Sequence, residues 1–180
     1  MTTVIRETRE TQVHVEAVRG TGNATVDTGV RFLDHMLITL ARTSGLDLTV
    51  TAGGDLKHHT IEDVAIAVGA AVLALRTDTA ARYGERTLAM DDALVQAVVD
   101  LGGRPFYLGP LPSALYDHWM RSFAFESKTT LHLRVLRGSD RHHVVEAAFK
   151  SLGLALRQAL AEGGSPSSTK GAVSLEVRGC

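Results

Sequence analysis

The chemistry that this sequence indicates is carried by one short motif that occurs twice. HHTIE occupies positions 58–62 and HHVVE occupies positions 142–146, 84 residues later. On a helix, residues four apart share a face, so the first histidine and the glutamate of each copy lie side by side. Each such pair can bind one metal ion. A single histidine on a helix is more often a surface or capping residue, but two matched copies favour metal ligands.

The remaining histidines of the pattern supply further ligands. His59 and His143 point about 100° away from their neighbours by helical geometry, so each is expected to bind a second ion. An Asp-His pair also occurs twice and contributes His35 and His118. Four ligands per ion follow: one set is His58, Glu62, His118 and His143, and the other is His142, Glu146, His35 and His59. Mixed imidazole and carboxylate ligands suit Mn, Fe, Co, Ni or Zn.

Hydrophobic periodicity predicts the elements that position these residues. Apolar residues at helical spacing predict helices over 32–43, 58–75, 116–124 and 142–160. Alternating polar and apolar residues predict strands over 12–18, 46–51, 94–101, 131–136 and 172–177. The glycine-rich stretch at 20–29 is expected to be a series of turns, and GSD at 138–140 is expected to be a turn and helix cap.

The order of these elements repeats along the chain, which indicates an internal duplication. We expect one α+β domain over residues 1–180, with repeats at about 1–87 and 88–180. Each pseudo-symmetric half should contain an antiparallel or mixed sheet packed by helices.

Composition excludes several classes of protein. With 44% apolar residues, 22% charged residues and a net charge of −1, the chain is typical of a globular protein and unlike an electrostatic nucleic-acid binder. The single cysteine, Cys180, allows no internal disulfide and no thiolate metal site. The N-terminal residues are charged, and the longest apolar stretch, 64–75, is too short to span a bilayer. We therefore expect a cytoplasmic protein without a nucleic-acid or membrane partner.

The sequence resembles the imidazoleglycerol-phosphate dehydratase family. The matching segments are FLDHM at 32–36, HHTIED at 58–63, DLGGRP at 100–105, HHVVEAAFK at 142–150 and STKG at 168–171. They occur in the family's order, and the likeness runs from about Glu10 to Gly171. The resemblance implies a ribosomal S5 domain 2-like fold. It also implies a lyase of histidine biosynthesis, which dehydrates D-erythro-imidazole glycerol phosphate to imidazole acetol phosphate.

The resemblance also implies cofactors and site residues. The family's two Mn²⁺ ligand sets fall on the eight residues named above, although other divalent transition metals would also fit. Glu10 corresponds to a substrate-contacting glutamate and is the candidate acid/base group. The candidate contacts to the phosphate substrate are Arg82, Arg104, Lys150, Ser168, Thr169 and Lys170. The resemblance further implies a 24-subunit homo-oligomer built from trimers, with active sites at subunit interfaces.

Two cations suit the dehydration chemically. The proton to be lost lies on a carbon without an adjacent carbonyl group to acidify it. An imidazole bound between two divalent cations loses its N–H proton readily, because positive charge stabilises the anion. We hypothesise that this imidazolate expels hydroxide, and that a general base then removes the carbon proton.

The chain departs from the family pattern at three places, and other interpretations remain open. The segments before His58 and between Arg104 and Tyr116 are short, and Asp92 stands where many relatives carry Glu. A binuclear metallohydrolase would instead release phosphate from esters. A metal-storing or structural oligomer would tolerate loss of Glu10, Arg82 and Arg104. An RNA-binding module of similar topology would need a basic stripe, which the sequence lacks.

Overall fold

The fold repeats one order of six elements. The computed structural model describes residues 1–163 and residue 176. The first half contains β1 (Thr2–Glu7), β2 (Thr11–Arg19), β3 (Ala24–Asp27), α1 (Arg31–Ser44), β4 (Leu46–Gly54) and α2 (Lys57–Leu75). The second half contains β5 (Tyr83–Met90), β6 (Ala93–Asp100), β7 (Phe106–Leu108), α3 (Ala114–Glu126), β8 (Thr130–Arg137) and α4 (Arg141–Ala159). The expected repeat boundary near residues 87 and 88 lies within β5.

Each half forms a four-stranded mixed sheet with the same topology. The strand orders are β1-β2-β4-β3 and β5-β6-β8-β7. The last strand of each order runs parallel to its neighbour, and the other pairs are antiparallel. Val15 pairs with Val50 at the centre of the first sheet, and Ala97 pairs with Leu133 at the centre of the second. The expected α+β fold with two similar halves is confirmed.

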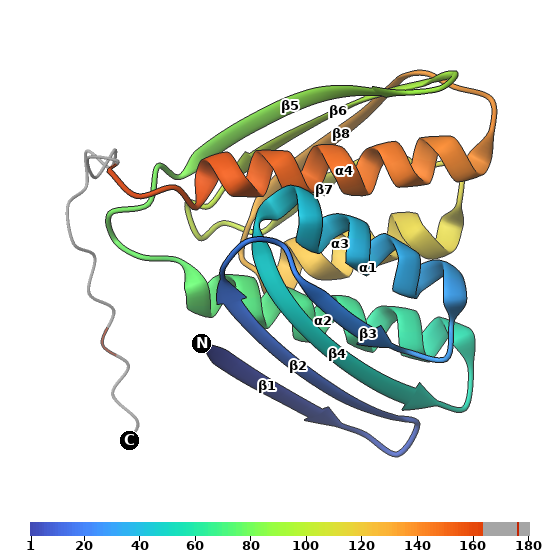
Figure 1. Cartoon of the computed structure of the whole chain (residues 1–180), viewed down its shortest axis with the longest axis vertical. Coiled ribbons are helices and arrows are strands. Elements are labelled where there is room, and N and C mark those ends of the chain that lie inside the picture. Colours follow the sequence, from blue (N-terminus) through green and yellow to red (C-terminus); the bar gives the residue numbers. More distant parts are fainter. Residues whose placement is uncertain (164–175, 177–180) are drawn as a thin grey trace.

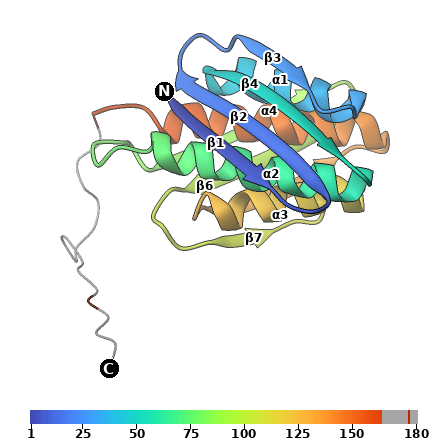
Figure 2. The same cartoon turned by 90° about the horizontal axis from the view of Figure 1, so that it is seen from below.

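The four helices form a layer between the two sheets (Figure 1). Helices α1 and α2 pack on the first sheet, and α3 and α4 pack on the second. The halves meet where α1 contacts α4 and α2 contacts α3. Figure 2 shows the same arrangement from below, with β1 and β2 crossing over α2. The alternating strand pattern is explained by this layering, because only one face of each sheet is covered by helices.

Close helix packing at these contacts depends on two glycines. A Cβ at position 69 would lie 2.9 Å from the carbonyl oxygen of Phe123, which belongs to α3. A Cβ at position 153 would lie 3.1 Å from the carbonyl oxygen of Leu40, which belongs to α1. The two glycines are 84 residues apart, the spacing of the histidine motif. The α2–α3 and α1–α4 contacts are therefore built in the same way.

Eight predicted elements are present, with ends within three residues of those expected. The structure adds four strands that the sequence patterns did not predict: β1, β3, β5 and β7. The stretch at 20–29 is not turns throughout, because it includes β3. The expected strand at 172–177 lies outside the described residues, apart from Glu176.

Helix α2 is apolar because it lies in the core. Among the described helices it alone is long and apolar enough to cross a bilayer by length and composition. Ten of its residues are buried in the helical layer, including Ile61, Val64 and Val68. Its position between the two sheets accounts for its composition.

Candidate metal centre

Helices α1 and α4 bring together His35, His142 and Glu146, which we call the His142 group. The Nε2 atoms of both histidines lie 3.1 Å from Oε2 of Glu146. The Glu146 side chain is only 8% exposed, whereas about half of each histidine side chain is exposed. The buried carboxylate thus holds two accessible imidazoles in a position to bind one ion.

Helices α2 and α3 bring together His58, Glu62 and His118, which we call the His58 group. The two carboxylate oxygens of Glu62 lie 3.5 Å from Nε2 of His58 and 3.3 Å from Nε2 of His118. The two imidazole rings stack with their centroids 5.1 Å apart. In each group the ligand atoms all lie within 4.8 Å of one another.

Each group combines residues from both halves of the chain because the helices pair across the halves. His35 on α1 meets the α4 residues, and His118 on α3 meets the α2 residues. Three members of each expected four-ligand set are therefore together in one chain. The fourth members, His143 and His59, lie in different clusters.

His59 and His143 are each held by aspartates. Nδ1 of His59 lies 2.8 Å from Oδ1 of Asp55, and Nδ1 of His143 lies 2.8 Å from Oδ1 of Asp92. Asp91 lies 3.5 Å from Nε2 of His143. The sequence patterns predicted no contact between these aspartates and the histidines. The four-residue spacing between Asp55 and His59 could have indicated the first contact, but Asp92 is 51 residues from His143 and gives no such pattern.

These contacts shift the ionisation of the groups involved. The hydrogen bond with Asp55 raises the pKa of His59, and the hydrogen bond with Asp92 raises the pKa of His143. Burial by itself would raise the pKa of Glu146, but hydrogen bonds from Lys150 and His35 outweigh it, and the pKa is lowered. Glu146 is therefore a carboxylate at neutral pH despite its burial.

The aspartates of the Asp-His pairs stabilise the chain before each helix. Oδ1 of Asp34 accepts hydrogen bonds from the backbone N–H and the hydroxyl of Thr28. Oδ1 of Asp117 accepts hydrogen bonds from the hydroxyl of Tyr107 and the N–H of Leu111. The aspartate of each pair thus fixes the start of the helix that carries the ligand histidine.

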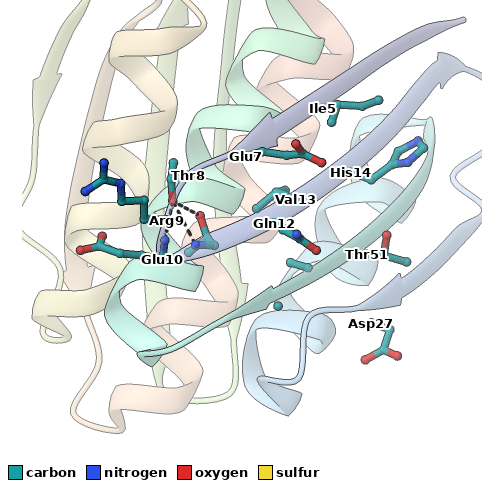
Figure 3. Close-up of a pocket in the computed structure, with 13 residues that line it drawn as sticks. Ile5, Glu7, Thr8, Arg9, Glu10, Gln12, Val13, His14, Asp27 and Thr51 are labelled. Atoms are coloured by element: carbon teal, nitrogen blue, oxygen red, sulfur yellow. Dashed lines mark hydrogen bonds between the residues drawn. The ribbon is translucent and has the colours of Figure 1, made fainter.

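Glu10 lies in the turn between β1 and β2. Its backbone N–H donates to the hydroxyl of Thr8 (Figure 3). Oε2 of Glu10 lies 3.5 Å from Nδ1 of His59. The same turn borders a hollow of about 720 Å³ on the solvent-facing side of the first sheet. The Glu10 side chain is 58% exposed, so it is accessible to a ligand.

The two candidate phosphate-binding arginines lie near the end of the chain opposite to His142. The backbone N–H of Arg82 donates to the carbonyl of Ala159, at the C-terminal end of α4. His142 is at the other end of this 19-residue helix, about 25 Å away. The Arg82 guanidinium binds the Asp100 carboxylate through two nitrogens. Arg104 is exposed in the neighbouring loop, and its carbonyl accepts from Thr130.

Lys150 contacts a candidate ligand. Its ammonium group lies 2.9 Å from Oε1 of Glu146 and 3.5 Å from the sulfur of Met90. Arg76, which the sequence analysis did not include, donates to the carbonyl of Leu101 near the arginines. The expected phosphate contacts Ser168, Thr169 and Lys170 lie outside the described residues.

The donor set of both groups fits a divalent transition metal. Nε2 of His118 is buried. Although Oε1 of Glu62 lies 3.3 Å away, the two atoms do not form a hydrogen bond, and no other described residue provides a hydrogen-bond partner. A buried unsatisfied nitrogen is costly, so a ligand at this position is expected. Each group offers two imidazoles and one carboxylate, and divalent transition-metal ions bind this combination of nitrogen and oxygen ligands.

Comparison with known proteins identifies similar sequences and structures. A family model described as imidazoleglycerol-phosphate dehydratase matches residues 28–156. The dehydratase of that name from Salinispora arenicola is 47% identical, over 86% of this chain and 87% of the relative. The one from Pyrobaculum aerophilum is 46% identical, over 93% and 97%.

Two solved structures of such enzymes resemble the whole fold. The Pyrococcus furiosus structure, a complex with (S)-C348, has a TM-score of 0.86 and 36% identity, and covers 94% of this chain and all of that one. The Staphylococcus aureus structure has a TM-score of 0.78 and 31% identity, over 89% and 98% of the two chains.

Proposed function

Because the chain belongs to the imidazoleglycerol-phosphate dehydratase family, we propose that it dehydrates D-erythro-imidazole glycerol phosphate with a dimanganese site that binds the substrate imidazolate. Membership of the family makes the chain a lyase of histidine biosynthesis. The product is imidazole acetol phosphate. The observation that carries the metal part of the proposal is the pair of matched groups, each with two histidines and one glutamate.

The eight candidate ligands divide between two ions. His35, His142 and Glu146 would bind one ion, and His58, Glu62 and His118 would bind the other. His59 and His143 of other subunits would complete the two sets, His59 for the first and His143 for the second. When bound, the two Mn²⁺ ions would act as Lewis acids that stabilise negative charge on the imidazole ring.

The side chains of the protein would supply the proton transfer and substrate orientation. Glu10 would exchange a proton with the substrate; its exposure and its closeness to His59 support this role. Arg104 is exposed and can bind the phosphate through charge-assisted hydrogen bonds. Arg82, Lys150, Ser168, Thr169 and Lys170 are the further proposed substrate contacts.

We propose that active sites form between subunits of a homo-oligomer. The length of α4 separates Arg82 from His142, a distance of about 25 Å that a substrate with a few carbon atoms does not span. A site that uses both ends of the chain therefore needs two chains. We propose the family's 24-subunit assembly and a cytoplasmic location.

Turnover by chelator-treated protein tests the proposed function. Metal removal should abolish formation of imidazole acetol phosphate from imidazole glycerol phosphate, and added Mn²⁺ should restore it. The product is measured by mass spectrometry, and elemental analysis confirms that the treated protein is free of metal. Full turnover by metal-free protein would contradict the proposal. Release of inorganic phosphate would instead support a metallohydrolase.

A further inference from the structure

The contact between His143 and Asp92 determines where the imidazole carries its proton. Nδ1 of His143 lies 2.8 Å from Oδ1 of Asp92. An ionised carboxylate only accepts hydrogen bonds, so the neutral imidazole must carry its proton on Nδ1. The other ring nitrogen, Nε2, then has a free lone pair; Oδ2 of Asp91 lies 3.5 Å from it and forms no hydrogen bond with it. A metal ion can bind only a nitrogen with such a lone pair.

Asp92 is itself held in a fixed orientation. Its other oxygen, Oδ2, accepts hydrogen bonds from the backbone N–H of Ser139 at 2.7 Å, the hydroxyl of Ser139 at 3.0 Å and the backbone N–H of Asp140 at 3.1 Å. These bonds connect the β5–β6 turn to the start of α4. The two oxygens therefore have separate partners: Oδ2 binds the backbone and Oδ1 binds the imidazole.

The first half of the chain has an equivalent contact from a different element. Nδ1 of His59 lies 2.8 Å from Oδ1 of Asp55, which comes just before α2. Glu10, in the β1–β2 turn, is farther from the same nitrogen, at 3.5 Å. In both halves an aspartate thus forms a hydrogen bond with Nδ1 of the second histidine of the motif.

We propose that Asp92 and Asp55 are positioning residues that keep the proton of His143 and of His59 on Nδ1, so that Nε2 is the metal-binding atom. This inference rests on the proposed function, because the ion it serves is the proposed Mn²⁺. A carboxylate that donates no ligand atom but orients a ligand histidine typically contributes a factor of about 10 to 100 to metal affinity.

Asp92→Asn tests the inference because the surrounding donors determine how the new amide is oriented. The two backbone N–H groups at Oδ2 require an acceptor, so the amide oxygen should face them and the NH₂ group should face His143. Nδ1 would then accept, and the proton would move to Nε2. We expect the Mn²⁺ affinity of metal-free protein to fall by about 10- to 100-fold. Competition with a fluorescent chelator measures this affinity.

Asp140→Asn is the matched control. It removes a negative charge that also acts on His143 but leaves the Asp92 contact intact. Asn caps a helix about as well as Asp, so the hydrogen bonds to the N–H groups of His142 and His143 should persist. We expect its Mn²⁺ affinity to stay within about threefold of the wild-type value, since an exposed charge contributes little.

A second measurement needs neither metal nor activity. Nitrogen-15 NMR of metal-free protein with labelled histidine, at about pH 9 where imidazole is neutral, shows which nitrogen carries the proton. His143→Gln identifies the His143 signal. The wild-type protein should carry the proton on Nδ1, and Asp92→Asn should carry it on Nε2. Because the wild-type protein alone tests the first statement, the test holds even where Asp92→Asn does not fold.

The outcomes separate this inference from the proposed function. Wild-type protein that binds no Mn²⁺ would contradict the proposed function, while the NMR result would still decide the protonation state. A wild-type His143 protonated on Nε2 would overturn the inference. Unchanged Mn²⁺ affinity in Asp92→Asn, or an equal loss in Asp140→Asn, would overturn it as well.

Discussion

Glu146 differs from the other seven candidate ligands because it is buried. Its Oε2 atom faces the two histidines of the His142 group, and its Oε1 atom faces Lys150. Only one of the two oxygens is therefore available to an ion. Glu62 has no such ion pair in the described part of the chain, and both of its oxygens face histidines. The two ion sites should differ in how their glutamate binds.

Glu146→Gln tests the contribution of this carboxylate. The change keeps the side-chain volume but removes the negative charge that faces both histidines and Lys150. We expect the protein to bind one ion less tightly by at least about tenfold and to lose most of its turnover. Titration of metal-free protein with Mn²⁺ measures the affinity for each ion. Glu16→Gln, on the exposed face of β2, is the control and should bind both ions normally.

Local spacing predicted some residue contacts and not others. The pairing of His142 with Glu146 follows from helical periodicity, and the sequence predicted it. The contact between Asp92 and His143 depends on how the β5–β6 turn folds onto the start of α4, so no periodic pattern in the sequence indicates it. The assignment of the eight ligands to two ions stays a prediction.

At the scale of elements, the four strands that sequence patterns missed are all edge strands. β1 and β3 form the edges of the first sheet, and β5 and β7 form the edges of the second. Edge strands have only one neighbour and bury fewer side chains, so their hydrophobic pattern is weak. β3 and β7 are also only four and three residues long. The central strands are longer than β3 and β7, and the central strands and the helices bury more side chains, so their patterns predicted them.

Gly69→Ala should separate α2 from α3. The new methyl group would lie 2.9 Å from the carbonyl oxygen of Phe123, and backbone atoms cannot rotate away from it. We expect a loss of about 1–3 kcal/mol in the free energy of unfolding, as is typical of overpacking. Denaturant unfolding of metal-free protein measures it. Gly53→Ala, where a Cβ has no neighbour within 4 Å, should change stability little. Equal stability of the two variants would show that the helices are not in close contact.

The hydrogen bonds of Asp47, in the first half of the chain, predict that the stability of the fold depends on pH. Oδ1 of Asp47 accepts backbone hydrogen bonds from Thr21, Gly22 and Asn23, and these bonds, led by that from Asn23, lower its pKa. A carboxyl group whose pKa is lower in the folded state stabilises the fold above its ordinary pKa of about 3.9. This contribution is lost as the pH falls below that value.

Asp47→Asn should therefore lower the melting temperature at pH 7, and the difference from wild type should shrink between about pH 4 and pH 2. Calorimetry of metal-free protein over this range measures the effect. Asp27→Asn is the control, because that carboxylate has one long hydrogen bond, 3.4 Å from the N–H of Gly29. A constant difference for Asp47→Asn across the range would contradict the account.

At the scale of the whole molecule, the candidate ligands and the candidate phosphate-binding arginines lie at opposite ends of the helical layer. The N-terminal ends of α2 and α4 point to one end of the chain, and the loops after α2 and β6 lie at the other (Figure 1). The sequence repeats predicted the two halves and their common topology. The repeats did not predict that the ligands and the arginines are far apart. This separation arises from the lengths and parallel directions of α2 and α4.

If active sites are shared between subunits, two inactive variants should restore each other's turnover. Glu146→Gln damages the histidine end of a chain, and Arg104→Ala damages the other end. Each variant alone should have little turnover. Oligomers assembled from both should recover a measurable fraction, because some sites combine the intact ends of two different chains. Variants that are mixed without reassembly serve as the control. No recovery in the mixed oligomer would indicate that each site lies within one chain.

The positions of bound Mn²⁺ would decide whether the His142 group and the His58 group are the two metal sites. Crystals of protein loaded with Mn²⁺ can be measured at the manganese absorption edge, where an anomalous difference map locates the ions. We expect two ions for each chain, one in contact with His35, His142 and Glu146 and the other in contact with His58, Glu62 and His118. Ions bound elsewhere, or neither group occupied in catalytically active crystals, would contradict this expectation.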